Sequence, residues 1–201
     1  MIADATARSV RRDRGARFSA LIRKWCDRID LVAWVAVADA HFLEPEAGDR
    51  WLDIGAAALP VSAVSGWVIE PRCGAAVTFV GTARDHSDGR HDVDRLEYEA
   101  YEEQVVQRFD RIVDEMRNRW PEVGRVAMLH RVGEVPVTEA AVVVAVASPH
   151  RSEAFAAASF GIDTLKATAP IWKRESWIGG ESWGLEPQHI LEVHGSEVGG
   201  A

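Results

Sequence analysis

Cysteine is scarce in this sequence, which holds only Cys26 and Cys73 among its 201 residues. Two cysteines are too few for the disulfide framework of a small secreted domain or for a cysteine-rich zinc module. A chain of this length also buries enough apolar surface to fold without such cross-links. We therefore expect one globular domain in a reducing compartment, the cytoplasm.

Long apolar runs and an excess of positive charge are missing as well. No run approaches the roughly 20 apolar residues that a helix needs to cross a bilayer, and no apolar core of a secretory signal follows the basic N-terminus. Acidic residues outnumber basic ones by 31 to 23, which gives a formal net charge of −8. Nucleic-acid binding requires a basic surface. We expect neither a membrane nor a nucleic acid as a partner.

The signature motifs of several enzyme classes are absent. The chain has no Walker loop, no Gly-x-Gly-x-x-Gly and no Gly-x-Ser-x-Gly. Its histidines, among them His86, His91, His130 and His150, show no metal-binding spacing, and no Cys-x-x-Cys is present. We therefore predict no metal centre.

Lysine is the scarcest charged residue: Lys24, Lys166 and Lys173 stand against 20 arginines. An amine can lose its proton in a suitable environment, whereas a guanidinium cannot. Lys166 and Lys173 flank Pro170, so a strand that folds back onto a helix end would bring both amines to one pocket. There, one amine could act as a nucleophile or proton carrier. The alternative, two solvent-exposed surface lysines, is favoured when these residues are considered alone.

Hydrophobic periodicity predicts a mixture of helices and strands. Helices are predicted at 60–69, 102–120 and 151–169. Strands are predicted at 74–80, 96–101, 123–132, 140–147, 171–177 and 188–193. The 140–147 segment is nearly all apolar and should be central, 74–80 should be a buried strand, and 133–139 should be a turn. Hairpin-like pairs of strands indicate an α+β fold with largely antiparallel pairing.

The first 28 residues differ from the rest in charge. They carry eight basic and three acidic residues, a local charge of +5 that leaves −13 for the remainder. Four apolar residues recur at helical spacing between positions 18 and 25, which indicates a short amphipathic helix able to bind an anionic surface. The simpler interpretation, which we favour, is a poorly packed extension. We expect residues 1–48 to form this basic, irregular extension and residues 49–201 to form the folded domain.

Two segments could bind an anion. His150 and Arg151 open the predicted helix 151–169, where free backbone N–H groups and the helix dipole favour phosphate or carboxylate. Arg84 lies in a polar loop after the predicted strand 74–80 and could contact the same kind of anion in bidentate fashion. The alternatives are a simply capped helix with Arg151 on the surface, and a surface loop arginine.

Five segments carry a more specific signal because they occur together, in order and with consistent spacing. They are Gly-Ala-Ala-Val-Thr-Phe-Val-Gly-Thr-Ala-Arg-Asp-His at 74–86, Leu-Glu-Tyr-Glu-Ala-Tyr at 96–101, His-Arg-Val-Gly at 130–133, Val-Val-Val-Ala-Val-Ala-Ser-Pro-His-Arg-Ser-Glu-Ala-Phe at 142–155, and Leu-Lys-Ala-Thr-Ala-Pro-Ile-Trp-Lys-Arg-Glu at 165–175. Together they resemble the large, catalytic subunit of molybdopterin synthase. The resemblance covers residues 59–193 and makes 49–201 the catalytic domain.

The resemblance implies an α+β fold described as an α/β-hammerhead with an added antiparallel β subdomain. It implies an enzyme of molybdenum cofactor biosynthesis. In this family, sulfur passes from the C-terminal Gly-Gly thiocarboxylate of a ubiquitin-like small subunit to cyclic pyranopterin monophosphate, which becomes molybdopterin by gaining its dithiolene. The large subunits form a homodimer at the core of a heterotetramer. No metal or organic cofactor is implied, because the sulfur arrives on the partner protein.

The resemblance also implies roles for individual residues. Lys166 matches the principal catalytic lysine, and Lys173 matches the second active-site lysine, with Glu175 orienting it. The resemblance further implies a phosphate pocket formed by Arg84, His150 and Arg151, which a dimer interface could divide between subunits. It also implies that Thr82 belongs to the substrate site and that Phe79 and Ile162 form its apolar lining.

This chain departs from the family pattern at three places. Thr82 stands where some members carry a basic residue, which removes one phosphate contact, and Asp85 stands where many carry Asn. Residues 1–48 have no counterpart in the minimal pattern and are too short to be a fused small subunit. Neither of the two single-residue departures affects the lysines, so we expect activity to be retained.

Two other functions stay open at this stage. A catalytically silent member of the family would act as a scaffold or binding module, and loss of Lys166 or Lys173 would have indicated it. Without the resemblance, the residues fit a phosphate-binding α+β enzyme with a lysine nucleophile. Such an enzyme would form a Schiff base at Lys166 with a carbonyl substrate and would need no protein partner.

Overall fold

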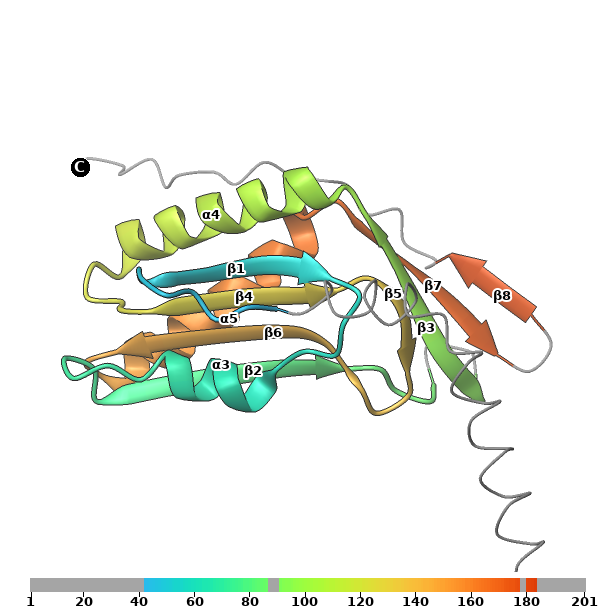
Figure 1. Ribbon diagram of the computed structural model, residues 1–201, viewed down its shortest axis with the longest axis horizontal. Coiled ribbons are helices and arrows are strands. Elements are labelled where there is room, and N and C mark those ends of the chain that lie inside the picture. Colours follow the sequence, from blue (N-terminus) through green and yellow to red (C-terminus); the bar gives the residue numbers. More distant parts are fainter. Residues whose placement is uncertain (1–41, 87–90, 178–179, 184–201) are drawn as a thin grey trace, which may run out of the picture. The chain divides into compact units, whose positions relative to one another are not determined.

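The computed structural model describes residues 42–86, 91–177 and 180–183 (Figure 1). The predicted strand 188–193 and nearly all of the predicted extension 1–48 lie outside these residues. The described part of that extension, residues 42–48, forms no helix or strand. All described residues belong to one structural unit, His41–Ala201.

The described elements mix helices and strands, as the sequence predicts for an α+β fold. In chain order they are β1 (Arg50–Gly55), α3 (Val61–Trp67), β2 (Ala75–Thr82), β3 (Val93–Ala100), α4 (Glu102–Arg119), β4 (Val126–Arg131), β5 (Gly133–Pro136), β6 (Ala140–Ser148), α5 (Arg151–Thr168), β7 (Ile171–Trp177) and β8 (Gly180–Trp183). The three predicted helices and the predicted strands that correspond to β3, β4, β6 and β7 are confirmed. None of the described helices is long and apolar enough to cross a bilayer.

The first sheet has the strand order β1-β4-β6-β2, with β1 parallel to β4 and the other pairs antiparallel. Successive residues of a strand point to opposite faces. In β4, Val126 and Met128 therefore pack in a core with α4 and α5, while Ala127 and Leu129 pack in a second core with α3. Both faces of β4 and β6 are covered, and this explains why the 140–147 segment is apolar throughout.

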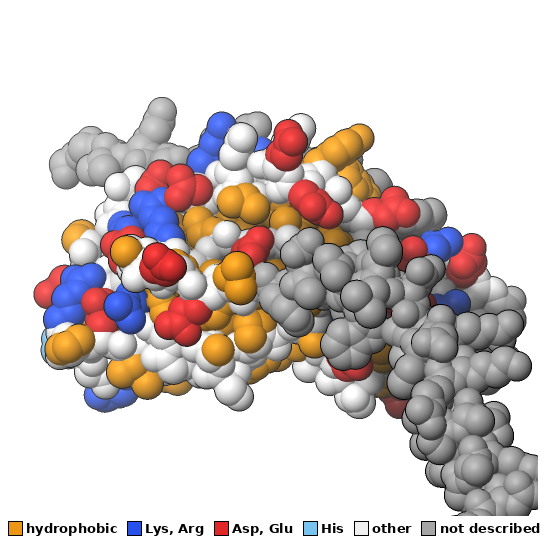
Figure 2. Space-filling model, viewed as in Figure 1, with side chains coloured by type: hydrophobic (Ala, Val, Ile, Leu, Met, Phe, Trp, Pro, Cys, Tyr) orange, Lys and Arg blue, Asp and Glu red, His pale blue; other side chains and the backbone are white. Residues whose placement is uncertain are grey.

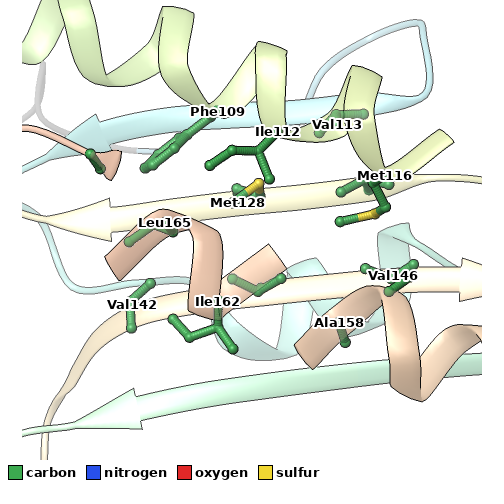
Figure 3. Close-up of a cluster of buried hydrophobic side chains, with 14 of the residues drawn as sticks. Phe109, Ile112, Val113, Met116, Met128, Val142, Val146, Ala158, Ile162 and Leu165 are labelled. Carbon is green, nitrogen blue, oxygen red and sulfur yellow. The ribbon is translucent and has the colours of Figure 1, made fainter. Parts of the chain in front are cut away.

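The larger core lies between the first sheet and the two long helices (Figure 3). The apolar stripe of α4 contributes Phe109, Ile112 and Met116, which are fully buried. From α5, Ile162 and Leu165 pack into the same core. Because α5 is fixed to the sheet along this face, the position of its C-terminal end is fixed as well.

The second sheet has the order β5-β3-β7-β8 and is antiparallel throughout. Its strands run across the end of the first sheet (Figure 1). The prediction of a turn over 133–139 is confirmed at residues 137–138 and wrong for residues 133–136, which form β5 and pair with β3. Gly133 has φ +73, a left-handed conformation that glycine adopts without strain, and there the chain turns from one sheet into the other. Val135 is then fully buried against Leu96.

Two further predictions about strands need correction. The 74–80 segment forms β2, but most of its residues are only half-buried, because β2 lies at the edge of its sheet and pairs with β6 alone among the described strands. An apolar run indicates a strand without showing whether a second strand covers its other edge. The sequence also does not predict β1, which is short and carries a charged residue at its start, Arg50, and another within it, Asp53.

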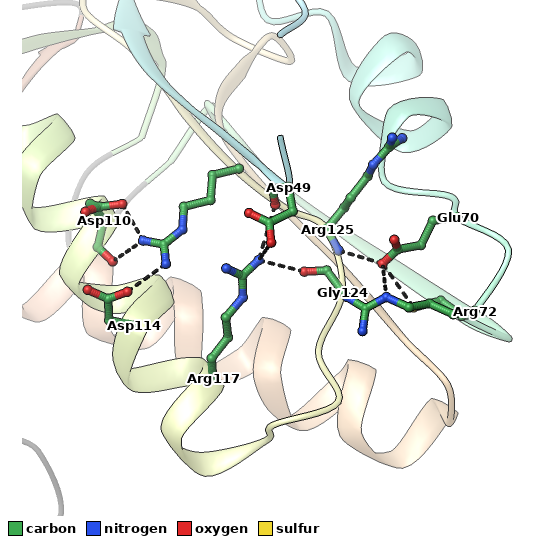
Figure 4. Close-up of polar contacts among 10 residues, drawn as sticks. Asp49, Glu70, Arg72, Asp110, Asp114, Arg117, Gly124 and Arg125 are labelled. Carbon is green, nitrogen blue, oxygen red and sulfur yellow. Dashed lines mark hydrogen bonds and ion pairs between the residues drawn. The ribbon is translucent and has the colours of Figure 1, made fainter. Parts of the chain in front are cut away.

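Ion pairs attach β1 and the chain before it to α4 (Figure 4). Arg50 bridges Asp110 and Asp114, with 2.7 Å between its Nη2 and Asp114 Oδ1. Arg117 donates to the Gly124 carbonyl at 3.0 Å and pairs with Asp49 at 2.9 Å. These contacts hold β1 in parallel register beside β4, at the edge of the sheet.

A substitution in the larger core should cost much of the protein's stability. We expect Phe109→Ala to lower the free energy of unfolding by about 3–5 kcal/mol, because it leaves a cavity between α4 and the sheet. Urea unfolding followed by circular dichroism measures the change. Gln107→Ala, on the exposed side of α4, should change it by less than about 0.5 kcal/mol. Equal effects of the two variants would contradict this packing.

Candidate functional site

A cavity of about 600 Å³ lies where the first sheet ends against the second. Its walls come from the ends of β2, β4 and β6, from the inner face of β3 and β7, and from the C-terminal half of α5. Three of its described lining residues are cationic, Arg84, Lys166 and Lys173, and one, Glu175, is a carboxylate. The cavity therefore carries an excess of positive charge in a protein that is acidic overall.

Both lysines line this cavity, on either side of the bend at Pro170. Lys166 lies in the last turn of α5 and is exposed. The helix ends at Thr168 because Ala169 takes an extended conformation, as the residue before a proline prefers. β7 then begins at Ile171 and runs back past the helix end, which brings Lys173 to the same cavity.

Lys173 and Glu175 form an ion pair with 2.7 Å between Nζ and Oε1. They point to the same face of β7 because they are two residues apart. The Glu175 side chain is only 6% exposed while that of Lys173 is 40% exposed. A buried carboxylate needs a cationic partner, so this pair holds the Lys173 ammonium at a set place in the wall. Among the described residues, no carboxylate forms an ion pair with Lys166.

Thr82 and Arg84 lie at the rim, where β2 ends. Between them, Ala83 is buried and fixed by two backbone hydrogen bonds: its N–H donates to the Glu139 carbonyl at 3.0 Å, and its carbonyl accepts from Thr138 N–H at 2.7 Å. This anchor sets where the exposed Arg84 side chain starts. Arg84 can therefore reach an anion at the mouth of the cavity.

Of the other implied substrate residues, Ile162 lines the cavity, whereas His150, Arg151 and Phe79 do not. His150 and Arg151 are exposed at the start of α5, and neither lines the cavity. Arg151 and Lys166 are fifteen positions apart, which corresponds to about 22 Å at the rise of an α-helix. Phe79 packs against the larger core below the cavity, whereas Ile162 lines the cavity directly. A single chain thus brings together Thr82, Arg84, Lys166, Lys173 and Glu175, but not His150, Arg151 and Phe79.

Two further residues that line the cavity, Tyr98 and His130, are not predicted as site residues by the sequence. Their rings meet edge to face at 4.9 Å between centroids. Burial, together with the nearby charge of Glu175, raises the pKa of Tyr98 to about 12. Burial also lowers the pKa of His130 to about 4. At neutral pH the phenol is therefore protonated and the imidazole uncharged.

One signal in the sequence could have drawn attention to His130. It follows Val126 and Met128 at every second position, so it continues an apolar row on the inner face of β4. A polar residue at the end of such a row must be hydrogen-bonded or face a cavity. Tyr98 carries no comparable signal, because tyrosine is common in half-buried strands.

The described residues contain no group of three or more His, Cys, Asp or Glu side chains that could hold a metal ion. The side chains that line the cavity supply two amines, a guanidinium, a carboxylate, a phenol, the hydroxyl of Thr82 and the two imidazoles of His86 and His130. Such a set can bind an anionic substrate and move protons next to it.

Comparison with known proteins relates this chain to a family. A model of the family described as MoaE protein matches residues 54–168. Molybdopterin synthase catalytic subunit 1 of Aedes aegypti is 46% identical over 123 residues, which are 61% of this chain and 79% of that protein. The solved structure of molybdopterin synthase from Staphylococcus aureus has a TM-score of 0.63 and 32% identity, covering 67% of this chain and 97% of that one.

A more distant structure shows the same fold. It is the complex of subunits 1 and 2 of molybdopterin-converting factor from Helicobacter pylori 26695, with a TM-score of 0.58 and 20% identity. The match covers 71% of this chain and 94% of that one.

The neutral, buried state of His130 should make stability depend on pH. The pKa of His130 is lowered from 6.5 to about 4 on folding, so its contribution is complete above pH 6.5 and is lost as the pH falls towards 4. Between pH 7 and pH 4 the protein should lose roughly 3 kcal/mol more unfolding free energy than the variant His130→Met. Urea unfolding at several pH values measures this difference.

The matched control is Leu129→Met, on the same strand but on its other face. This variant should keep the pH dependence of the unaltered protein. If His130→Met has that same pH dependence, His130 does not titrate as its burial requires.

Proposed function

The chain belongs to the MoaE protein family of molybdopterin synthase catalytic subunits, and we propose that its cavity transfers sulfur from a small-subunit thiocarboxylate to cyclic pyranopterin monophosphate. The reaction forms the dithiolene of molybdopterin in the biosynthesis of molybdenum cofactor. One observation supports the proposal most directly. Lys166, Lys173 and Arg84 belong to different segments of the sequence, yet all three side chains line one cavity.

The charge of the cavity suits both reactants. The substrate carries a cyclic phosphate and the donor a thiocarboxylate, so both are anions. Three cationic side chains against one carboxylate attract them into the cavity although the whole protein is acidic. On the face in view in Figure 2, by contrast, the Lys and Arg side chains that are drawn lie interspersed with Asp and Glu side chains.

Lys166 is the residue we assign to the chemical step. For each sulfur, a C–S bond forms to the substrate while a C–O bond of the substrate breaks, and that oxygen leaves as water or with the phosphate. Water takes the place of sulfur at the acyl carbon, so that the donor tail ends as a carboxylate. These steps develop negative charge on the acyl oxygen and require protons to move. The Lys166 amine can stabilise that charge and transfer a proton.

Lys173 has a supporting role in this proposal. Its Nζ lies 2.7 Å from Glu175 Oε1, and this ion pair restricts the positions that the ammonium can take. A fixed cation lowers the energy of anionic states nearby and requires no rearrangement during the reaction. Glu175 acts through Lys173 and is therefore a positioning residue.

A small subunit is the partner that this chemistry needs, because no sulfur-containing residue is among the described residues that line the cavity. The Helicobacter pylori structure of the same fold is a complex of two subunits of molybdopterin-converting factor. We infer a similar complex here, with the C-terminal Gly-Gly tail of a ubiquitin-like small subunit entering the cavity. Cytoplasmic location stays a prediction from composition.

His150 and Arg151 can join this site only from a second copy of the chain, because α5 separates them from Lys166 by about 22 Å. A homodimer would place the start of α5 of one copy at the cavity of the other. These two side chains would then complete the phosphate site. The dimer would form the core of a heterotetramer, with one small subunit at each cavity.

The first test is reconstitution of the reaction. The purified chain is mixed with a thiocarboxylated small subunit and cyclic pyranopterin monophosphate, and the dithiolene product is measured. We expect Lys166→Ala to lower the rate by about 10²–10⁴-fold, because the group that stabilises charge and moves protons is removed. Lys166→Arg should not restore the rate, since a guanidinium keeps the charge but cannot exchange a proton.

The outcomes separate the candidate functions. Full activity of Lys166→Ala would contradict the role of this amine. A chain that binds the small subunit but makes no product would be the silent scaffold. A chain that binds no small subunit would be a different enzyme of the phosphate-binding class, and borohydride trapping of Lys166 with a carbonyl substrate would identify it.

A second test addresses the shared site. Lys166→Ala and Arg151→Ala are purified separately, and each should be inactive or nearly so. After mixing and exchange of subunits, half of the dimers contain one intact site. About a quarter of the activity of the unaltered protein should therefore return. A mixture as inactive as its components would show that each chain uses its own Arg151.

A further inference from the structure

The cavity has a floor that differs in chemistry from its rim. The cationic side chains lie at the rim and on the walls. Deeper in, the lining is apolar and comes from buried residues of β6, α5 and β7, namely Val142, Ile162, Leu165 and Ile171. His130, Tyr98 and the buried carboxylate of Glu175 are the polar groups of this inner region, and the proposed mechanism gives His130 and Tyr98 no role.

The position of His130 follows from the register of the first sheet. It lies beside Val142 of β6 and Ile54 of β1, at the end of the inner row of β4. Its side chain is buried, with the residue only 5% exposed, and the ring of Tyr98 packs against it edge to face. The imidazole is therefore held in one orientation by its neighbours.

The hydrogen bonding of His130 determines which of its nitrogens carries the proton. Nδ1 lies 2.8 Å from the carbonyl oxygen of Arg131. A carbonyl can only accept, so Nδ1 must be the donor. Because the ring is uncharged at neutral pH, Nε2 carries no proton and is an acceptor.

This acceptor has no partner within the described part of the chain. Nε2 of His130 makes no hydrogen bond to a described residue, and it is not among the side-chain nitrogens enclosed by protein atoms. Since His130 lines the cavity, Nε2 opens into it. A fixed, uncharged acceptor beside buried apolar lining residues selects a ligand with an N–H or O–H group beside a flat apolar surface.

We propose that His130 binds the pterin ring of the substrate, with Nε2 accepting a hydrogen bond from a ring or amino N–H. This inference rests on the proposed function and adds a ring site on the floor to the anion site at the rim. A pterin is a flat bicycle whose edge carries several N–H donors, so it matches both the apolar walls and the acceptor. The N–H groups of the donor tail are the other source of such a hydrogen bond. An extended peptide, however, leaves the flat apolar walls without a matching face.

The test compares His130→Met with the unaltered chain, each in complex with the thiocarboxylated small subunit. Methionine fills a similar volume in a buried site without a polar atom that must be satisfied, so the variant should fold. We expect KM for cyclic pyranopterin monophosphate to rise about tenfold, the loss typical of one buried hydrogen bond. The value of kcat at saturating substrate should stay within about threefold, because binding and not chemistry is affected. KM for the small subunit should not change.

Two competing ligands map the floor against the rim. A reduced pterin without phosphate should inhibit His130→Met about tenfold more weakly than the unaltered chain, while inorganic phosphate should inhibit both equally. For Arg84→Gln we expect the reverse. Inorganic phosphate should inhibit this variant more weakly than the unaltered chain, while the phosphate-free pterin should inhibit both equally. His130→Gln, which keeps an acceptor at the end of its side chain, should recover part of the affinity for the pterin, and Leu129→Met should match the unaltered chain throughout.

The results that overturn the proposal are specific. Equal inhibition of His130→Met and the unaltered chain by the phosphate-free pterin would show that Nε2 does not bind the ring. A higher KM for the small subunit in place of the pterin would show that Nε2 binds the donor tail. Failure of the proposed function is distinguishable from both, because the unaltered chain itself would then make no dithiolene.

Discussion

The bend at Pro170 is the constraint on which the site depends. α5 is fixed to the first sheet through the larger core, while β7 is fixed in the second sheet by pairing with β3. Only Ala169 and Pro170 separate the two elements, and the Pro170 carbonyl accepts a hydrogen bond from Tyr101 N–H at 3.3 Å. This short connection between two rigid bodies leaves little freedom for Lys166 and Lys173. The distance between the backbones of the two lysines is thus determined by the packing of the core and not by the contacts of their side chains.

The distribution of charge and burial divides the cavity into two parts with different tasks. At the rim and walls, cations exceed carboxylates, which favours anionic reactants in a protein of opposite net charge. Glu175 is buried yet ionised through its pairing with Lys173, and its charge is one reason why the pKa of Tyr98 is high. Deeper in, His130 stays neutral because burial disfavours its charged form. The cationic side chains therefore favour anionic groups at the rim and walls, while an uncharged acceptor lies on the floor.

How far the sequence predicted the fold depends on how local each signal is. The stripe of α4 and the proline after α5 are local, and both helices were predicted within a few residues. The local pattern predicts a turn at Gly133–Pro136, because the strand character of this segment depends on pairing with β3, some 40 residues earlier in the chain. The edge position of β2 depends equally on what lies beside it. Local periodicity contains no information about such neighbours.

The same distinction holds for the site. Sequence alone determined that a helix ends at Pro170 with a lysine on each side, and that Arg84 follows a strand, because these facts concern residues close together in the chain. Only the tertiary structure decided that Arg84 shares a cavity with the two lysines, that Tyr98 and His130 meet on its floor, and that His150 and Arg151 lie at the far end of α5. The physical reason is that strand register and sheet crossing bring together side chains distant in sequence. These depend on the packing of the whole domain.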